Sequence, residues 1–443
     1  MLLGAADGDR CDALRRAAIP GLAITNAERS GAMCRVDAVA RPRPDAAIGI
    51  ELWLPPPSQW TGRYYQMGNG GFAGSIDGAT LQAAAARGDI AVATDTGHKG
   101  SGFDASWAIA RPDLVEDYAW RSIKITADAA NALTRLYYGK PARRRYFMGC
   151  SFGGRQALTA AARWPADWDG IIAGAPATDW PTRIAGFARI QHALRGVPGG
   201  WIAPDRIADL VATARRLCRA GQSGCAIDSL RRACRGGKPT ACLTTPQEAS
   251  LRTIEAAGYP LVDADPAEWQ RWIVNPDPEA PSQLTFAMQA YRWLFGVSRN
   301  WTPADDVALT PDRGRTLTFS VGSLRPFLAK GGKVISYFGT ADAVLPPALA
   351  AADARARGAA MRTYRLFMVP GMAHCQGGSA PHAFGQSLSA PALADDPRSD
   401  VRRMLEAWVE RSVTPRLLVA ATVGPEPRRT VTLLPVEFAA APR

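Results

Sequence analysis

The chain has 443 residues, of which 47% are hydrophobic, so it can bury a large core and is too apolar to be disordered. No run of 18 or more apolar residues occurs, so no transmembrane helix is predicted and we expect no membrane partner. The formal net charge is +12. The arginines are scattered and no base-stacking aromatic pattern accompanies them, so we expect a solvated basic surface and no nucleic-acid partner.

Strand-like and helix-like segments alternate through the first 180 residues. The expected strands are residues 47–54, 64–67, 90–94, 145–148 and 171–174. The expected helices are residues 117–138, which have helical spacing, and the alanine-rich residues 155–163. This alternation predicts an α/β fold with a mostly parallel sheet.

The character of the sequence changes after residue 178, where strand alternation stops, tryptophans and prolines become frequent and four cysteines cluster. We interpret residues 179–311 as a lid domain inserted between two parts of the core, residues 1–178 and 312–443. The second part is expected to contain strands at 333–338 and 364–369 and a helix at 401–409.

A serine lies between two glycines in Gly149-Cys150-Ser151-Phe152-Gly153, which fits the nucleophile-elbow pattern Gly-x-Ser-x-Gly. A strand is expected before the serine and a helix after it, which is the context that the pattern requires. The sequence therefore predicts Ser151 as a nucleophile, with the Phe152 N–H as one oxyanion donor.

A serine nucleophile needs a base, and the chain has only four histidines. His374 lies in a loop that follows an expected strand late in the chain, where this architecture has its base. His98 is the rival, but it precedes the serine. His192 falls in the lid, and His382 in a Gly/Ser/Ala stretch that resembles surface.

The orienting acid and the second oxyanion donor are predicted from their positions after strands. Asp342 follows the strand at 333–338 and a glycine turn, and it can hold the tautomer of the histidine. The glycine-rich loop at 68–74 follows the strand at 64–67, so Gly70 or Gly71 is expected to donate the second N–H.

Eight cysteines suggest disulfides and an oxidising compartment. A zinc site is the weaker alternative, because the clustered cysteines lack short Cys-x2-Cys pairs. Cys150 adjoins the predicted nucleophile and Cys375 the predicted base, so a bridge between them would bring serine and histidine close. Such a bridge would add about 5 kcal/mol in the chain-entropy model; the alternative is two buried free cysteines.

With these residues in place, nearly the whole chain resembles the tannase and feruloyl esterase family of α/β-hydrolases. The matching segments are GNGG (68–71), DTGH (95–98), DASW (104–107), GCSFGGRQ (149–156), DGIIAGAP (169–176), CLT (242–244) and GMAHC (371–375). The resemblance implies an α/β-hydrolase fold with a lid, a Ser151–Asp342–His374 triad, a Cys150–Cys375 bridge and export. It also implies hydrolysis of esters of aromatic carboxylic acids, such as ferulates and gallates.

The chain departs from the family in its lid. Relatives carry an acidic calcium loop between two cysteines, whereas the segment from Cys218 to Cys225 has no carboxylate, so no calcium and no other cofactor is expected. A C-terminal cysteine pair of the relatives is also missing. The remaining pairs that we expect are Cys11–Cys34, Cys218–Cys225 and Cys234–Cys242.

We therefore predict a serine carboxylesterase for small phenolic esters, either free or attached to plant polysaccharide or polyphenol. The lid residues expected to form the aromatic-acid pocket are Phe286, Tyr291, Arg292, Trp293, Phe295 and Trp301; the same cluster is equally consistent with lid core. The alternatives are a terephthalate monoester hydrolase, a peptidase or amidase with the same triad, or a non-catalytic polyphenol- or carbohydrate-binding protein. Residues 1–4 do not resemble a signal peptide, so a secreted or periplasmic protein would have lost its leader from this sequence.

Overall fold

The computed structural model describes residues 7–219, 224–305, 314–319, 321–348, 350, 362–424 and 428–436. It divides into two compact units. The first comprises Met1–Thr178, Phe319–Ile335 and Leu405–Val413, and the second comprises Asp179–Thr318, Ser336–Met404 and Thr414–Arg443. The predicted end of the lid, at residue 311, lies outside the described residues, and the proposed three-part organisation stays a prediction.

Among the described residues, nine strands form one sheet in the order β1-β2-β3-β5-β4-β6-β7-β8-β9. The strands are β1 Leu22–Ser30, β2 Met33–Ala40, β3 Ile48–Leu54, β4 Arg63–Met67, β5 Ile90–Thr94, β6 Arg144–Cys150, β7 Gly170–Gly174, β8 Lys333–Gly339 and β9 Tyr364–Val369. Strands β5, β4, β6 and β7 pair in parallel, whereas β1, β2, β3 and β5 pair antiparallel in that order. The predicted α/β architecture is confirmed, with an antiparallel edge.

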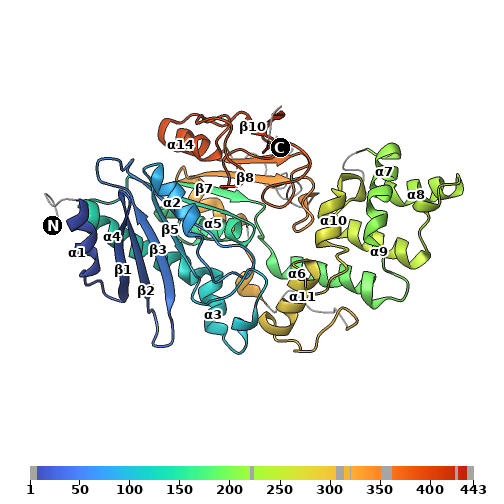
Figure 1. Ribbon diagram of the computed structural model, residues 1–443, viewed down its shortest axis with the longest axis horizontal. Helices are drawn as coiled ribbons and strands as arrows, with labels where there is room; N and C mark the ends of the chain where they lie inside the picture. The colour runs from blue at the N-terminus through green and yellow to red at the C-terminus, as the bar shows by residue number, and fades with distance from the viewer. Residues whose placement is uncertain are drawn as a thin grey trace. The chain divides into compact units, whose positions relative to one another are not determined.

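The parallel strands are short and apolar because both of their faces are covered. All residues of β5 and β7 are buried. The helices of the first unit include α1 Asp7–Arg15, α2 Gly78–Ala86, α3 Pro112–Glu116, α4 Ser122–Tyr138, α5 Phe152–Arg163 and α12 Arg325–Ala329. Figure 1 shows α1 beside α4, against which it packs.

Two helices of the first unit differ from the sequence expectation. The segment expected as one helix over 117–138 begins with a π-helical turn at Asp117–Arg121, and only then continues as α4. Helix α5 begins at Phe152 rather than Arg155, directly after the predicted nucleophile. Gly153 and Gly154 have low helix propensity, so the sequence does not predict a helix that begins at Phe152.

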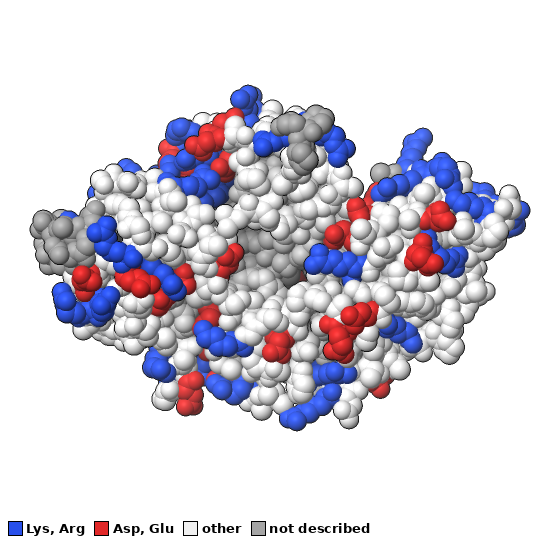
Figure 2. Space-filling view, viewed as in Figure 1, with Lys and Arg blue, Asp and Glu red and all other residues white. Residues whose placement is uncertain are grey.

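The segment predicted as a lid is helical in its described part. Its helices are α6 Trp180–Gln191, α7 Ile207–Leu217, α8 Cys225–Arg235, α9 Thr245–Ala256, α10 Pro266–Trp272 and α11 Gln283–Gln289. In Figure 1, α7, α8, α9 and α10 gather in one group. Helices α7 and α8 carry the exposed Arg216, Arg232 and Arg235, and Figure 2 shows Lys and Arg side chains gathered over the end of the lid that these helices form.

After β9 the chain forms α14 Val401–Arg411 and a two-stranded sheet of β10 Leu418–Ala421 and β11 Thr430–Leu433. Helix α14 confirms the helix expected at 401–409. In the part of the chain that the structure describes, no helix is long and apolar enough to cross a membrane.

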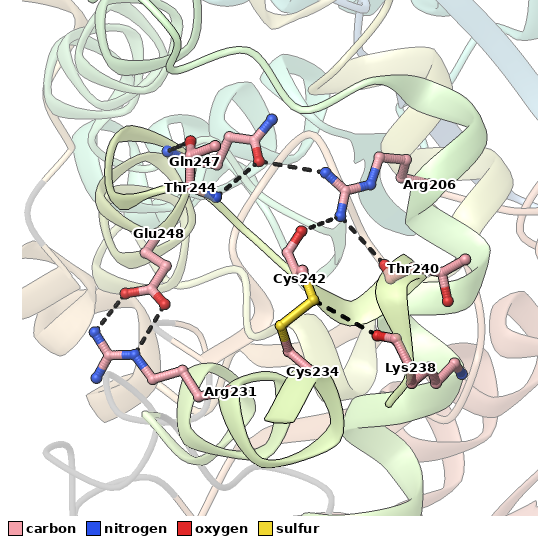
Figure 3. The surroundings of a disulfide bond; sticks show 9 residues. All are labelled: Arg206, Arg231, Cys234, Lys238, Thr240, Cys242, Thr244, Gln247 and Glu248. Carbon is pink, nitrogen blue, oxygen red and sulfur yellow. Dashed lines mark hydrogen bonds and ion pairs between the residues drawn. A yellow bond between two sulfur atoms is a disulfide. The ribbon is translucent and has the colours of Figure 1, made fainter. Parts of the chain in front are cut away.

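Disulfides tie local segments together in both units. Cys11–Cys34 joins α1 to β2, while Cys218–Cys225 and Cys234–Cys242 lie in the lid; these are the pairings that the family resemblance implies. Figure 3 shows that Arg206 donates to the carbonyl oxygens of Thr240 and Cys242 beside the last bridge. Cys150 and Cys375 are also disulfide-bonded, so no described cysteine is free.

Candidate active site

Ser151 occupies a strained turn between β6 and α5. Its backbone has φ 60° and ψ −126°, a conformation that non-glycine residues rarely adopt. Hydrogen bonds hold this backbone on both sides, because the Ser151 N–H donates to the Gly174 carbonyl at 2.9 Å and the Ser151 carbonyl accepts from the Ala177 N–H at 3.1 Å. The serine hydroxyl is thus presented at the N-terminus of α5, whose dipole favours negative charge.

Close backbone packing explains the glycines that surround the serine. A Cβ atom on Gly149 would lie 2.5 Å from the carbonyl carbon of Gly153, and one on Gly153 would lie 2.9 Å from the carbonyl oxygen of Asn69. A Cβ atom on Gly68 would lie 2.6 Å from the Cα of Gly153. Strand β6, helix α5 and the 68–74 loop therefore approach one another more closely than any side chain allows.

The 68–74 loop leaves two backbone donors open. The Gly68 N–H donates to the Met148 carbonyl and the Asn69 N–H to the Gln156 side chain. The N–H groups of Phe72, Ala73 and Gly74 donate to the carbonyls of Gly102, Gly70 and Gly100, respectively. Among the described residues, the N–H groups of Gly70 and Gly71 have no hydrogen-bond partner. The Phe152 N–H, in the first turn of α5, is likewise unpaired within the described chain. These are the donors that the sequence predicts for an oxyanion.

Asp342 and His374 are brought together in the second unit, in the loops that follow β8 and β9. The His374 Nδ1 lies 2.8 Å from the Asp342 Oδ2, and the aspartate side chain is fully buried. The Asp342 Oδ1 accepts from the N–H groups of Val344 and Leu345, each at 2.8 Å. A carboxylate accepts hydrogen bonds, so this contact suits the imidazole tautomer that has its proton on Nδ1.

The loop that carries Asp342 is held by two lid residues. Gln283 donates to the Ala343 carbonyl at 2.8 Å, and the Tyr259 hydroxyl donates to the Val344 carbonyl at 2.7 Å. Both side chains are buried. No motif in the sequence marks these two residues, because each acts over more than 50 positions of the chain. Reasoning from sequence therefore missed them.

The other histidines have local partners. The His98 Nε2 donates to the Phe72 carbonyl at 2.9 Å, while its Nδ1 lies 3.2 Å from the Thr96 hydroxyl. Burial lowers the pKa of His98, so its ring is neutral and supports the 68–74 loop. His192 contacts the Pro303 carbonyl and His382 the Ala380 carbonyl through Nδ1.

The predicted pocket residues of the lid fall in two aromatic clusters. Phe286 packs against Trp180 and Trp272, at centroid distances of 5.4 and 6.4 Å. Tyr291 contacts Trp301 at 4.2 Å and Phe295 at 5.8 Å. Arg292 donates to the Trp301 carbonyl, and Trp293 is half-buried under the guanidinium of Arg299. Their part in substrate binding stays a prediction.

The sequence matches one protein family over most of its length. The family model described as tannase and feruloyl esterase matches residues 34–274 and 283–436. The chain belongs to this family. It is 33% identical to an uncharacterized esterase of Xanthomonas campestris pv. campestris, over 88% of this chain and 77% of that protein. It is 28% identical to feruloyl esterase C of Talaromyces stipitatus, over 89% of this chain and 79% of that protein.

Solved structures of the family share the fold. Feruloyl esterase B from Aspergillus oryzae superposes with a TM-score of 0.78 at 21% identity, covering 97% of this chain and 96% of the other. Tannin acyl hydrolase from Aspergillus niger gives 0.67 at 20% identity, covering 97% and 91%. The predicted α/β-hydrolase fold is thus confirmed, and this member of the tannase and feruloyl esterase family is a carboxylic ester hydrolase.

Proposed function

We propose that the protein is a serine esterase for esters of aromatic, phenolic carboxylic acids, with Ser151 as nucleophile, His374 as base and Asp342 as the orienting acid. The observation that carries the proposal is the strained backbone of Ser151 at the start of α5, which is the geometry of a nucleophile elbow. The Asp342–His374 hydrogen bond supports the proposal, because such a contact favours the tautomer that a base requires.

The proposed reaction has two halves. The Ser151 Oγ attacks the ester carbonyl carbon while its proton moves to the His374 Nε2, and the oxyanion is held by the N–H groups of Phe152 and of Gly70 or Gly71. The C–O bond then breaks, and the leaving alcohol takes the proton from His374. Water attacks the acyl-enzyme by the same route and releases the aromatic acid and the free serine.

We also propose that Cys150 and Cys375 bridge each other. Both are disulfide-bonded, and the other six cysteines pair among themselves. A bridge between the neighbours of Ser151 and His374 would limit the separation of nucleophile and base, because bridged Cα atoms lie within about 7 Å. Peptide mapping without reduction tests the pairing directly.

The substrate class is inferred from relatives named feruloyl esterase and from the aromatic lid. The Tyr291 hydroxyl and the Trp301 indole N–H are two of several buried side-chain groups in the described chain that have no hydrogen-bond partner. A phenolic substrate that opened this cluster could satisfy them. The Cys218–Cys225 segment has no Asp or Glu, and its residues 220–223 lie outside the described chain. The proposal therefore includes no calcium and no cofactor. Disulfides favour an oxidising compartment, so we propose export.

The test compares the wild type with Ser151→Ala on methyl ferulate, methyl gallate, mono(2-hydroxyethyl) terephthalate and a peptide amide. Loss of a triad serine is expected to lower turnover by about 10⁶, whereas Ser106→Ala, an exposed serine of the same unit, should keep full activity. Hydrolysis of the terephthalate ester or the amide in preference to the phenolic esters would reassign the substrate. Undiminished activity of Ser151→Ala would remove the proposed mechanism.

A further inference from the structure

Tyr118 contacts residues from which both predicted oxyanion donors come. Its hydroxyl donates to the Gly71 carbonyl at 2.5 Å. Its ring stacks on that of Phe152, with centroids 4.0 Å apart and an interplanar angle of 7°. One buried side chain therefore contacts both the glycine loop and the residue after the nucleophile.

The backbone conformation of the 68–74 loop depends on such contacts. Gly71 has a φ of +54°, so its conformation is not restrained by a side chain of its own. The Ala73 N–H donates to the Gly70 carbonyl, the Tyr118 hydroxyl to the Gly71 carbonyl, and the His98 Nε2 to the Phe72 carbonyl. The Gly71 N–H shares a peptide plane with the Gly70 carbonyl, which the Ala73 N–H holds. The next peptide plane is held at its Gly71 carbonyl by Tyr118 and at its Phe72 N–H by the Gly102 carbonyl. The backbone on both sides of Gly71, and with it the direction of the Gly71 N–H, is therefore restrained.

Tyr118 is itself held firmly. It belongs to the π-helical turn Asp117–Arg121, a feature often found at functional sites. The fully buried Asp117 side chain accepts from Arg43 at 2.6 Å and from Arg121 at 2.7 Å, which anchors the turn. The Trp107 ring lies 5.1 Å from that of Tyr118. Burial raises the pKa of Tyr118 well above its usual value, so the hydroxyl stays protonated and can donate.

We propose that Tyr118 is a positioning residue that aligns the oxyanion donors of Gly70 or Gly71 with that of Phe152. The inference rests on the proposed function, since it concerns the same oxyanion. The Tyr118 hydroxyl bonds to the peptide group that follows Gly71, so it acts on the proposed donor through the backbone conformation of Gly71.

The test uses Tyr118→Phe, which keeps the stacked ring and removes only the hydroxyl. Tyr138→Phe is the matched control, because the Tyr138 hydroxyl also donates to a backbone carbonyl, that of Pro55, at 2.7 Å and in a buried position. Tyr118→Leu removes both the hydroxyl and the stacked ring. Kinetics on the best ester of the panel, the affinity of a boronic acid that mimics the tetrahedral state, and melting temperature are measured for each variant.

For Tyr118→Phe we expect kcat to fall about ten- to hundredfold with KM nearly unchanged, since removal of an oxyanion donor itself costs about 10² to 10³. Affinity for the boronic acid should fall by a similar factor, and Tyr118→Leu should lose more. Tyr138→Phe should lower the melting temperature comparably and leave kcat unchanged.

The proposal is overturned if Tyr118→Phe keeps the kcat of the wild type, or if both tyrosine variants lose kcat equally, as a structural role would predict. It is also overturned if Tyr118→Phe does not fold while Tyr118→Leu folds with full kcat. An inactive Ser151→Ala beside a fully active Tyr118→Phe would refute this inference alone. An active Ser151→Ala would refute the proposed function.

Discussion

The surroundings of Ser151 and those of the Asp342–His374 pair are built in different ways. Around Ser151, glycines bring backbone against backbone, and the conformation is fixed by main-chain hydrogen bonds to Gly174 and Ala177. Around Asp342, side chains do this work, because Gln283 and Tyr259 hold the carbonyls of its loop. The first arrangement is sensitive to added volume, and the second to lost hydrogen bonds.

This difference also determines which of the two regions can be predicted from a sequence pattern. The glycines that this packing requires lie in two short segments, residues 149–153 and the 68–74 loop, so each segment can be recognised as a motif. The side chains that contact Asp342 or its loop are Tyr259, Gln283 and His374. They are far apart in the sequence, and no local pattern connects them.

After Ser151→Ala, the largest effect is expected for Asp342→Asn, which changes the acid of the Asp342–His374 pair while keeping the size and shape of its side chain. An amide can donate to Nδ1 and so favour the wrong tautomer, and kcat should fall by about 10⁴. Steady-state kinetics on the best ester measure this. A matched change at a surface carboxylate, Asp77→Asn at the start of α2, should leave kcat unchanged, and an equal loss in both variants would contradict the assignment of Asp342.

The close packing around Ser151 should be disrupted when a side chain is added to one of its glycines. In Gly149→Ala, the new Cβ atom would meet the backbone of Gly153 at 2.5 Å, so we expect a loss of about 1–3 kcal/mol in the free energy of unfolding and a large loss of kcat. The control is Gly186→Ala within α6, where a Cβ atom has no neighbour within 4 Å and where alanine favours the helix by about 0.5–1 kcal/mol. Denaturant unfolding of both variants checks the contrast. Equal stability of the two would argue against close packing at the elbow.

A smaller effect is expected for Tyr259→Phe, which removes one lid hydrogen bond from the Asp342 loop. The free energy of unfolding should fall by about 1 kcal/mol, and kcat should fall several-fold because the carboxylate is less well aligned. Tyr64→Phe removes a buried hydroxyl that donates to Gln66 within the sheet, so it should cost similar stability without the loss of kcat. If kcat is unchanged in Tyr259→Phe, the lid does not position the acid.

The smallest effect concerns pH and the glycine loop. The pKa of His98 is lowered by burial, so between its folded pKa and the unfolded value near 6.5 the unfolded state binds more protons. Stability is therefore full above about pH 6.5 and declines as the pH falls below it. The melting temperature of the wild type should drop more between pH 7 and pH 5 than that of His98→Gln, which has an amide that does not titrate. Parallel pH profiles would contradict this role of His98.

Much of the core could be predicted, because short apolar runs such as Ile90–Thr94 report buried strands directly. The β1–β2 hairpin was missed, although β2 alternates between buried and half-buried residues. The π-helical turn at Tyr118 and the contacts of Tyr259 were beyond sequence reasoning, since both depend on partners that are distant in the chain. The sequence could place Ser151, Asp342 and His374 after strands, because each follows a recognisable apolar run and a glycine; their roles as a triad stay a prediction.

The central claim is that Ser151 is the nucleophile, and labelling by a fluorophosphonate followed by peptide mass spectrometry tests it most directly. The account predicts one adduct, on the peptide that contains Ser151, formed more slowly in His374→Ala and absent in Ser151→Ala. An adduct on a different residue, or undiminished labelling of Ser151→Ala, would contradict it.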